Sequence, residues 1–141
     1  MPEPAPAILV IDSSVAVKWF LPEGEADGER AWALLESHLA ERIRLAAPDH
    51  LRLEVLNALR HRGFNAQTIR RAADALDGFH LVWHPVSASL AVAACDIAAR
   101  HGLTLYDAAY AALAVALDAE LVTADRRLAG SGAGRARLLA E

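Results

Sequence analysis

The chain has 141 residues, which suits one domain with a single sizeable core, and its 55% apolar content excludes a disordered chain. Its net charge of -4 argues against broad, sequence-independent nucleic-acid binding through a basic surface. No apolar run is long enough to cross a bilayer, and the start of the chain lacks the basic region of a secretory signal. We therefore expect one soluble, cytoplasmic domain over residues 1–141, with no membrane contact.

The first predicted element is a strand over Ala7–Ile11, because this run is continuously apolar, as in a parallel sheet buried on both faces. Asp12 ends the strand and can cap a helix that reaches about Leu21, before Pro22. The pattern then predicts a helix over 29–38, a strand over 44–47 and a helix over 50–62 with Asp49 at its N-cap.

The second half continues the alternation of helices and strands. The predicted elements are a helix over 65–76, a strand over 80–84, a helix over 87–101, a helix over 105–117, a strand over 120–123, a helical turn and a last strand over 136–139. The helix over 105–117 is apolar on all sides and belongs in the middle of the domain. Cys95, the only cysteine, lies in an Ala-rich helix and is expected to be a small buried hydrophobe. The alternation predicts a three-layer α/β/α fold with a mainly parallel central sheet.

Three aspartates have ordinary structural interpretations. Asp12 and Asp125 each follow a predicted strand and precede a helix, as an N-cap does. Asp107 follows Thr104 by three residues ahead of an apolar run, which matches a capping box. Glu54 has no such explanation, because it lies inside a predicted helix, too deep to cap it, among apolar neighbours. A salt bridge to a distant Arg is its structural alternative.

Taken together, the four acids indicate a metal site. Sites in parallel α/β sheets lie beyond the carboxyl ends of the strands, where Asp12 and Asp125 are placed. Four carboxylates that converge there repel one another unless cations intervene. Oxygen-only ligands suit Mg²⁺ or Mn²⁺, which bind substrate phosphates, can generate a hydroxide nucleophile and can stabilise the leaving oxygen of an in-line displacement.

Four stretches resemble a known family in order and spacing. They are Val10-Ile11-Asp12-Ser13-Ser14-Val15-Ala16-Val17-Lys18-Trp19-Phe20, Leu53-Glu54-Val55-Leu56-Asn57-Ala58-Leu59, Leu105-Tyr106-Asp107-Ala108-Ala109-Tyr110 and Leu121-Val122-Thr123-Ala124-Asp125-Arg126-Arg127-Leu128. The sequence resembles a PIN-domain ribonuclease, and in particular the VapC-type toxins of type II toxin–antitoxin systems. The resemblance covers nearly the whole chain.

The resemblance implies an Mg²⁺- or Mn²⁺-dependent endoribonuclease with four metal-binding catalytic acids. These are Asp12, Glu54, Asp107 and Asp125, called the acidic quartet below. Ser13 would take the hydroxyl position beside the first Asp, and Thr123 would orient the last Asp. The resemblance also implies a structured RNA substrate, products with a 5′-phosphate and a 3′-hydroxyl, a homodimer, and a cognate antitoxin whose tail blocks the site.

Other functions remain open from the sequence. A housekeeping nuclease, or a PIN-like domain that has lost catalysis and only binds RNA or protein, would show the same motifs. A phosphoacceptor domain of flavodoxin-like build also places Asp at strand ends, but it needs a Lys near the last strand, and the only Lys is Lys18. The arginines over 60–71 are either a solvated face or a contact for RNA phosphates or an acidic partner. All six histidines are expected to be structural or surface residues.

Overall fold

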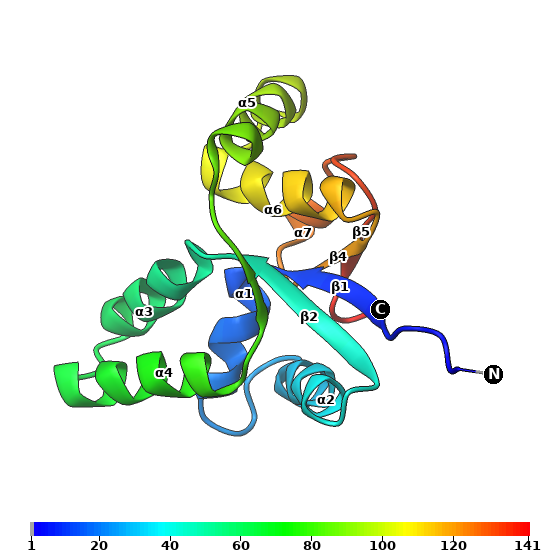
Figure 1. The fold of residues 1–141 in the computed structure, drawn as a ribbon. Helices are drawn as coiled ribbons and strands as arrows, with labels where there is room; N and C mark the ends of the chain where they lie inside the picture. The colour runs from blue at the N-terminus through cyan, green and yellow to red at the C-terminus, as the bar shows by residue number, and fades with distance from the viewer. Residues whose placement is uncertain (1) are drawn as a thin grey trace.

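The computed structural model describes residues 2–141 as a parallel sheet with helices on both faces (Figure 1). The strands, in spatial order, are β3 (Val82–His84), β2 (Ile43–Pro48), β1 (Ala7–Ile11), β4 (Glu120–Thr123) and β5 (Ala136–Leu138). Every neighbouring pair is parallel. The predicted α/β/α class is therefore confirmed. The order also differs from the flavodoxin-like order 2-1-3-4-5, so the phosphoacceptor alternative is not supported.

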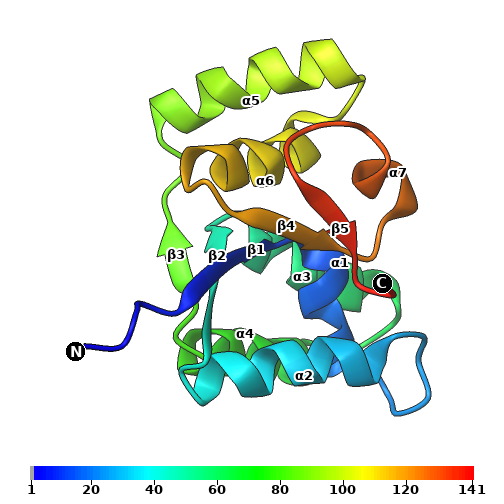
Figure 2. The same ribbon diagram turned by 90° about the vertical axis from the view of Figure 1, so that its right-hand side faces the viewer.

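The helices form two layers, seen edge-on in Figure 2. One face of the sheet carries α1 (Ser13–Ala16), the 3₁₀ helix η1 (Val17–Phe20), α2 (Gly28–Leu39), α3 (Leu51–His61) and α4 (Ala66–Gly78). The other carries α6 (Leu105–Ala116), with α5 (Ala88–His101) packed outside it. The short α7 (Arg126–Ala129) follows β4. No helix within residues 2–141 is long and apolar enough to span a membrane.

Strand β1 lies at the centre of the sheet. It pairs with β2 on one side and β4 on the other, and Val10 and Ile11 are fully buried. Only this carboxyl end of β1 is buried on both faces, as a parallel sheet requires, because Ala7 and Ile8 at its start are exposed. The next residue, Asp12, therefore emerges at the middle of the carboxyl edge of the sheet.

Helix α6 is the buried helix that its sequence predicts. Residues 108–114 are all buried, five of them are alanines, and the helix contacts β1, β2 and β4. Small side chains let its backbone approach the sheet closely. The Thr104 hydroxyl accepts a hydrogen bond of 3.1 Å from the Asp107 N–H, so the first half of the expected capping box is present.

Three local expectations differ from the structure. Cys95 is exposed; it belongs to α5, and Figure 1 shows no further layer outside this helix. Asp49 is not the cap of α3: its carboxylate accepts a hydrogen bond from the Val86 N–H, and His50 occupies the N-cap position. The helix after Asp12 tightens into 3₁₀ geometry at Val17 and ends at Phe20.

Candidate active site

Asp12 is a buried carboxylate at the carboxyl end of β1, and it is only 3% exposed. Oδ1 accepts a hydrogen bond of 2.6 Å from the Ser14 hydroxyl, and Oδ2 accepts one of 2.5 Å from the Thr123 hydroxyl. Burial, together with the negative charge of Asp107, raises the pKa of Asp12 to about 6 against the effect of these hydrogen bonds. The carboxylate is thus held in place by two hydroxyls and is costly to ionise without a cation.

The same hydroxyls tie Asp12 to the end of β4. The Ser14 hydroxyl accepts a hydrogen bond of 2.8 Å from the Ala124 N–H, and Thr123 Oγ1 accepts one of 3.0 Å from the Asp125 N–H. Asp125 also caps α7, because its Oδ1 accepts from the N–H groups of Arg127 and Leu128. The expected cap is confirmed, and the network fixes two acids at neighbouring strand ends.

Asp107 lies in the first turn of α6 and links the charges of the site. Its pKa is raised, first by partial burial and then by the negative charges of Asp125 and Glu54. Its own charge in turn raises the pKa of Asp12. The structure therefore brings the four predicted acids into one electrostatic neighbourhood, with Asp107 at its centre.

Glu54 is fixed by two residues that the sequence analysis did not select. Its Oε1 accepts a hydrogen bond of 2.5 Å from the buried Tyr110 hydroxyl and lies 3.4 Å from His50 Nε2. The same His50 nitrogen lies 3.1 Å from the carbonyl oxygen of Tyr106. Since both partners are acceptors, Nε2 carries the proton. Glu54 is thus held against α6 through one oxygen, and within residues 2–141 it forms no salt bridge to a distant Arg.

Removing the Tyr110 hydroxyl should loosen Glu54. We expect Tyr110→Phe to lower the free energy of unfolding by about 1–2 kcal/mol, since a hydrogen bond to a charged group is lost while the ring still fills the core. Cleavage of RNA should fall by about tenfold if Glu54 serves the reaction. Urea denaturation and initial cleavage rates measure the two effects. Tyr106→Phe is the matched control, because Tyr106 is 65% exposed; an equal loss in both variants would contradict this role.

The acidic quartet has the chemistry of a site for a hard divalent cation. Within residues 2–141, Asp12, Asp107 and Asp125 form no ion pair with Lys, Arg or His, so their charge has no direct cationic partner. The same part of the chain shows no group of three or more His, Cys, Asp or Glu side chains that could hold an ion as arranged. The donors fit Mg²⁺ or Mn²⁺ in type, and their side chains must turn toward a common point to bind one.

The hydroxyl beside the first Asp is supplied by Ser14. The sequence analysis assigned this position to Ser13, whose hydroxyl instead lies near that of Tyr110, a residue whose pKa is raised, first by burial and then by the charge of Glu54. Thr123 is fully buried and contacts both Asp12 and the Asp125 N–H. His50 and Tyr110 gave no sequence signal, because their contacts with Glu54 arise only from the packing of α3 against α6.

Comparison with known proteins places this arrangement in a family. The family model described as PIN domain matches residues 9–131. The chain therefore belongs to the PIN domain family. A search of curated protein sequences found no match.

Solved structures with the same fold include one described as a toxin and one described as a toxin–antitoxin complex. The fold is similar to Mycobacterium tuberculosis VapC20, described as a sarcin-ricin loop cleaving toxin, with a TM-score of 0.72 and 19% identity over 92% of this chain and 98% of that one. It is also similar to VapBC2 from Rickettsia felis bound to a promoter DNA fragment, with a TM-score of 0.69 and 14% identity over 93% of this chain and 98% of that one. FitAcB from Neisseria gonorrhoeae matches with a TM-score of 0.67 and 17% identity over 91% and 95%.

Proposed function

We propose that the chain is a metal-dependent endoribonuclease and the toxin of a toxin–antitoxin pair. The observation that carries the proposal is the state of Asp12: a buried carboxylate, locked by two hydroxyls at the end of the central strand, beside the unpaired charge of Asp107. A fold gains no stability from such a group unless a cation binds it. Membership of the PIN domain family supports the same chemistry.

The positions of the site residues suggest a different role for each in metal binding and catalysis. Asp12, Asp107 and Asp125 would hold the ion. Ser14 and Thr123 hold Asp12 and Asp125 in place through hydrogen bonds. Glu54, with Oε1 bound to Tyr110, has Oε2 left to bind a second ion or to position the attacking water. A bound Mg²⁺ or Mn²⁺ would neutralise the acids where phosphate docks and stabilise negative charge on the phosphate oxygens. The expected products carry a 5′-phosphate and a 3′-hydroxyl.

The toxin role rests on the kinds of proteins that share the fold. One, from Klebsiella pneumoniae, is described as a toxin–antitoxin complex, and VapC20 is described as a sarcin-ricin loop cleaving toxin. We propose by analogy a structured RNA substrate, a cognate antitoxin that blocks the site, and a homodimer. A small reading frame next to the gene that encodes a DNA-binding protein would support the antitoxin.

The test is digestion of total RNA by the purified protein, followed by sequencing of the new 5′ ends. Wild type with Mg²⁺ or Mn²⁺ should cut at few sites, and Asp12→Asn should leave the RNA intact. Full activity in excess EDTA would contradict the metal-dependent mechanism. RNA left intact by wild type under all ionic conditions would instead favour a binding module.

A further inference from the structure

A groove opens directly beside Glu54, between α3 and α4. It has a volume of about 810 Å³ and is lined by Leu53, Glu54, Leu56, Asn57, Arg60, Ala66, Ile69, Arg70 and Tyr106. Its walls come from the outer faces of α3 and α4 and from the first turn of α6. Glu54 belongs to the acidic quartet and Tyr106 directly precedes Asp107, so the groove adjoins the quartet.

Large apolar groups are exposed at that end without an evident structural reason. Tyr106 is 65% exposed and Leu53 is 73% exposed. The Tyr106 ring lies 6.2 Å from the His50 ring, measured between centroids, and His50 is anchored to the Tyr106 carbonyl. A supported aromatic ring with an exposed face is the standard platform for stacking an unpaired nucleobase.

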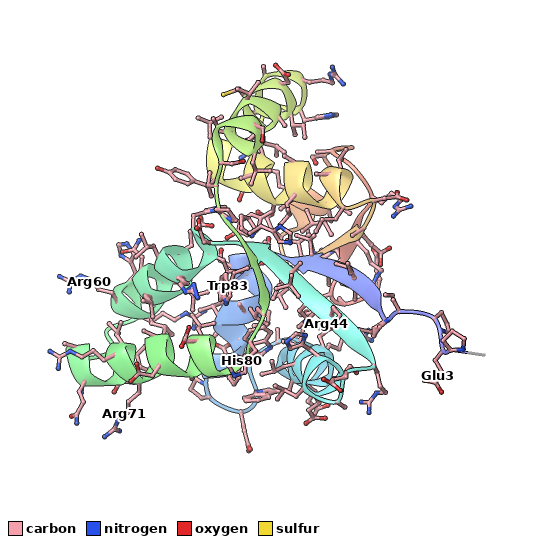
Figure 3. The ribbon with its side chains drawn as sticks, in the orientation of Figure 1. Glu3, Arg44, Arg60, Arg71, His80 and Trp83 are labelled. Atoms are coloured by element: carbon pink, nitrogen blue, oxygen red, sulfur yellow. The ribbon has the colours of Figure 1, made fainter. Side chains whose placement is uncertain are left out.

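The other end of the groove is cationic. Arg60 on α3 and Arg70 on α4 both line it and are exposed. Within residues 2–141 neither forms an ion pair, whereas Arg62, at the C-cap of α3, pairs with Glu25 at 2.7 Å. Figure 3 shows Arg60 extending outward from α3. Two unpaired guanidinium groups across one groove are suited to bind phosphate oxygens.

We propose that this groove is a nucleotide subsite: Tyr106 stacks on an unpaired base of the RNA, and Arg60 and Arg70 bind the phosphates that follow it. Asn57 also lines the groove, and its amide can donate to and accept from a base edge. The subsite holds single-stranded RNA with one end at Glu54, so it selects unpaired nucleotides beside the cleaved bond. This proposal rests on the proposed ribonuclease function and adds which part of the RNA the protein recognises.

The charge pattern favours RNA over an acidic or apolar peptide as the occupant. Arg60 and Arg70 are separated from the Tyr106 ring by the apolar side chains that line the groove. This arrangement matches a single RNA strand, in which phosphates and bases follow one another along the chain. A double helix presents no free base face to Tyr106 and should bind less tightly. A protein partner in this groove is the competing outcome of the test.

Binding can be measured apart from cleavage in the Asp12→Asn background. The probe is a short, fluorescein-labelled single-stranded RNA of mixed sequence in millimolar Mg²⁺, followed by fluorescence anisotropy. Adding Tyr106→Ala should raise Kd about tenfold or more, while Tyr106→Phe should keep it within about twofold. Adding Arg60→Gln with Arg70→Gln should raise Kd and reduce the slope of log K against log salt by about 0.7 per arginine.

The matched control is Arg71→Gln. Arg71 is the next residue on α4, but it lines a separate groove with Phe20 and Phe64, and Figure 3 shows it on the side of α4 away from α3. It should change Kd by less than about twofold. Thermal melting of each variant checks folding. An unchanged Kd in the folded Tyr106→Ala and double arginine variants would overturn the proposal and leave the groove to a protein partner.

The subsite and the ribonuclease function fail in different ways. If single-stranded RNA binds through Tyr106 but wild type cleaves no RNA with Mg²⁺ or Mn²⁺, the nuclease function is wrong and the subsite stands. If wild type cleaves RNA and Tyr106→Ala cleaves it with the same KM and kcat, the function stands and the subsite is wrong. The combined account expects a KM raised about tenfold with a smaller change in kcat.

Discussion

Asp107→Asn is expected to abolish RNA cleavage while leaving the melting temperature unchanged or raising it. Asparagine keeps the size of the side chain and leaves the Asp107 N–H free to donate to Thr104 Oγ1. It removes the charge that repels Asp12, Glu54 and Asp125, so the metal-free fold should become more stable. Loss of one charged ligand from the site should reduce the cleavage rate by about 100-fold or more.

The control for this variant is Asp96→Asn. Asp96 is exposed on α5, and we expect its replacement to change neither the cleavage rate nor the melting temperature. Initial rates on one RNA and thermal melting in EDTA give the two readouts. A large loss of stability with intact cleavage would mean that Asp107 serves only the start of α6.

The metal-free protein should lose stability as the pH rises from about 4 to about 7. The pKa of Asp12 is 3.8 in the unfolded chain and about 6 in the fold, so between these values the folded state binds more protons than the unfolded state. By linkage the free energy of unfolding then falls with rising pH. The shift corresponds to on the order of 3 kcal/mol once Asp12 is fully ionised, and the raised pKa of Asp107 acts in the same direction.

Asp12→Asn isolates this contribution. The variant cannot titrate at this position, so the difference between wild type and variant should fall by that amount over this pH range, whatever constant offset the altered hydrogen bonds with Ser14 and Thr123 introduce. Urea denaturation in EDTA at several pH values measures it. Adding Mn²⁺ near neutral pH should restore much of the loss to wild type only. If the free energy of unfolding varied with pH in the same way in both proteins, the ionisation of Asp12 would not destabilise the fold and the prediction would be wrong.

The order and class of the elements could be predicted because each carries a local signal. The β-branched run of β1 and the uncharged run of α6 are such signals, and both elements occupy the predicted positions. The faces of helices on the outer layer are harder to predict. Cys95 lies in an Ala-rich segment that looks buried, but α5 packs on α6 through one side only.

The sequence predicts the four acids of the site, but it does not predict the residues that hydrogen-bond to them and hold them in place. Asp12 and Asp125 follow strands, Asp107 follows a capping Thr, and Glu54 was conspicuous among apolar neighbours. The contacts that hold them join distant segments: Tyr110 is 56 residues from Glu54, and Thr123 is 111 residues from Asp12. No local pattern specifies which hydroxyl completes such a contact, which is why Ser14 replaces the expected Ser13.

The central claim is that the acidic quartet binds one metal centre, and a titration with Mn²⁺ tests it most directly. Calorimetry near neutral pH should compare wild type with Asp12→Asn, Glu54→Gln, Asp107→Asn and Asp125→Asn, with Asp96→Asn as the control. We predict saturable binding by wild type and the control, and affinity at least about tenfold weaker in Asp12→Asn and Asp107→Asn. Absence of binding by folded wild type, or equal binding by every quartet variant, would contradict the account.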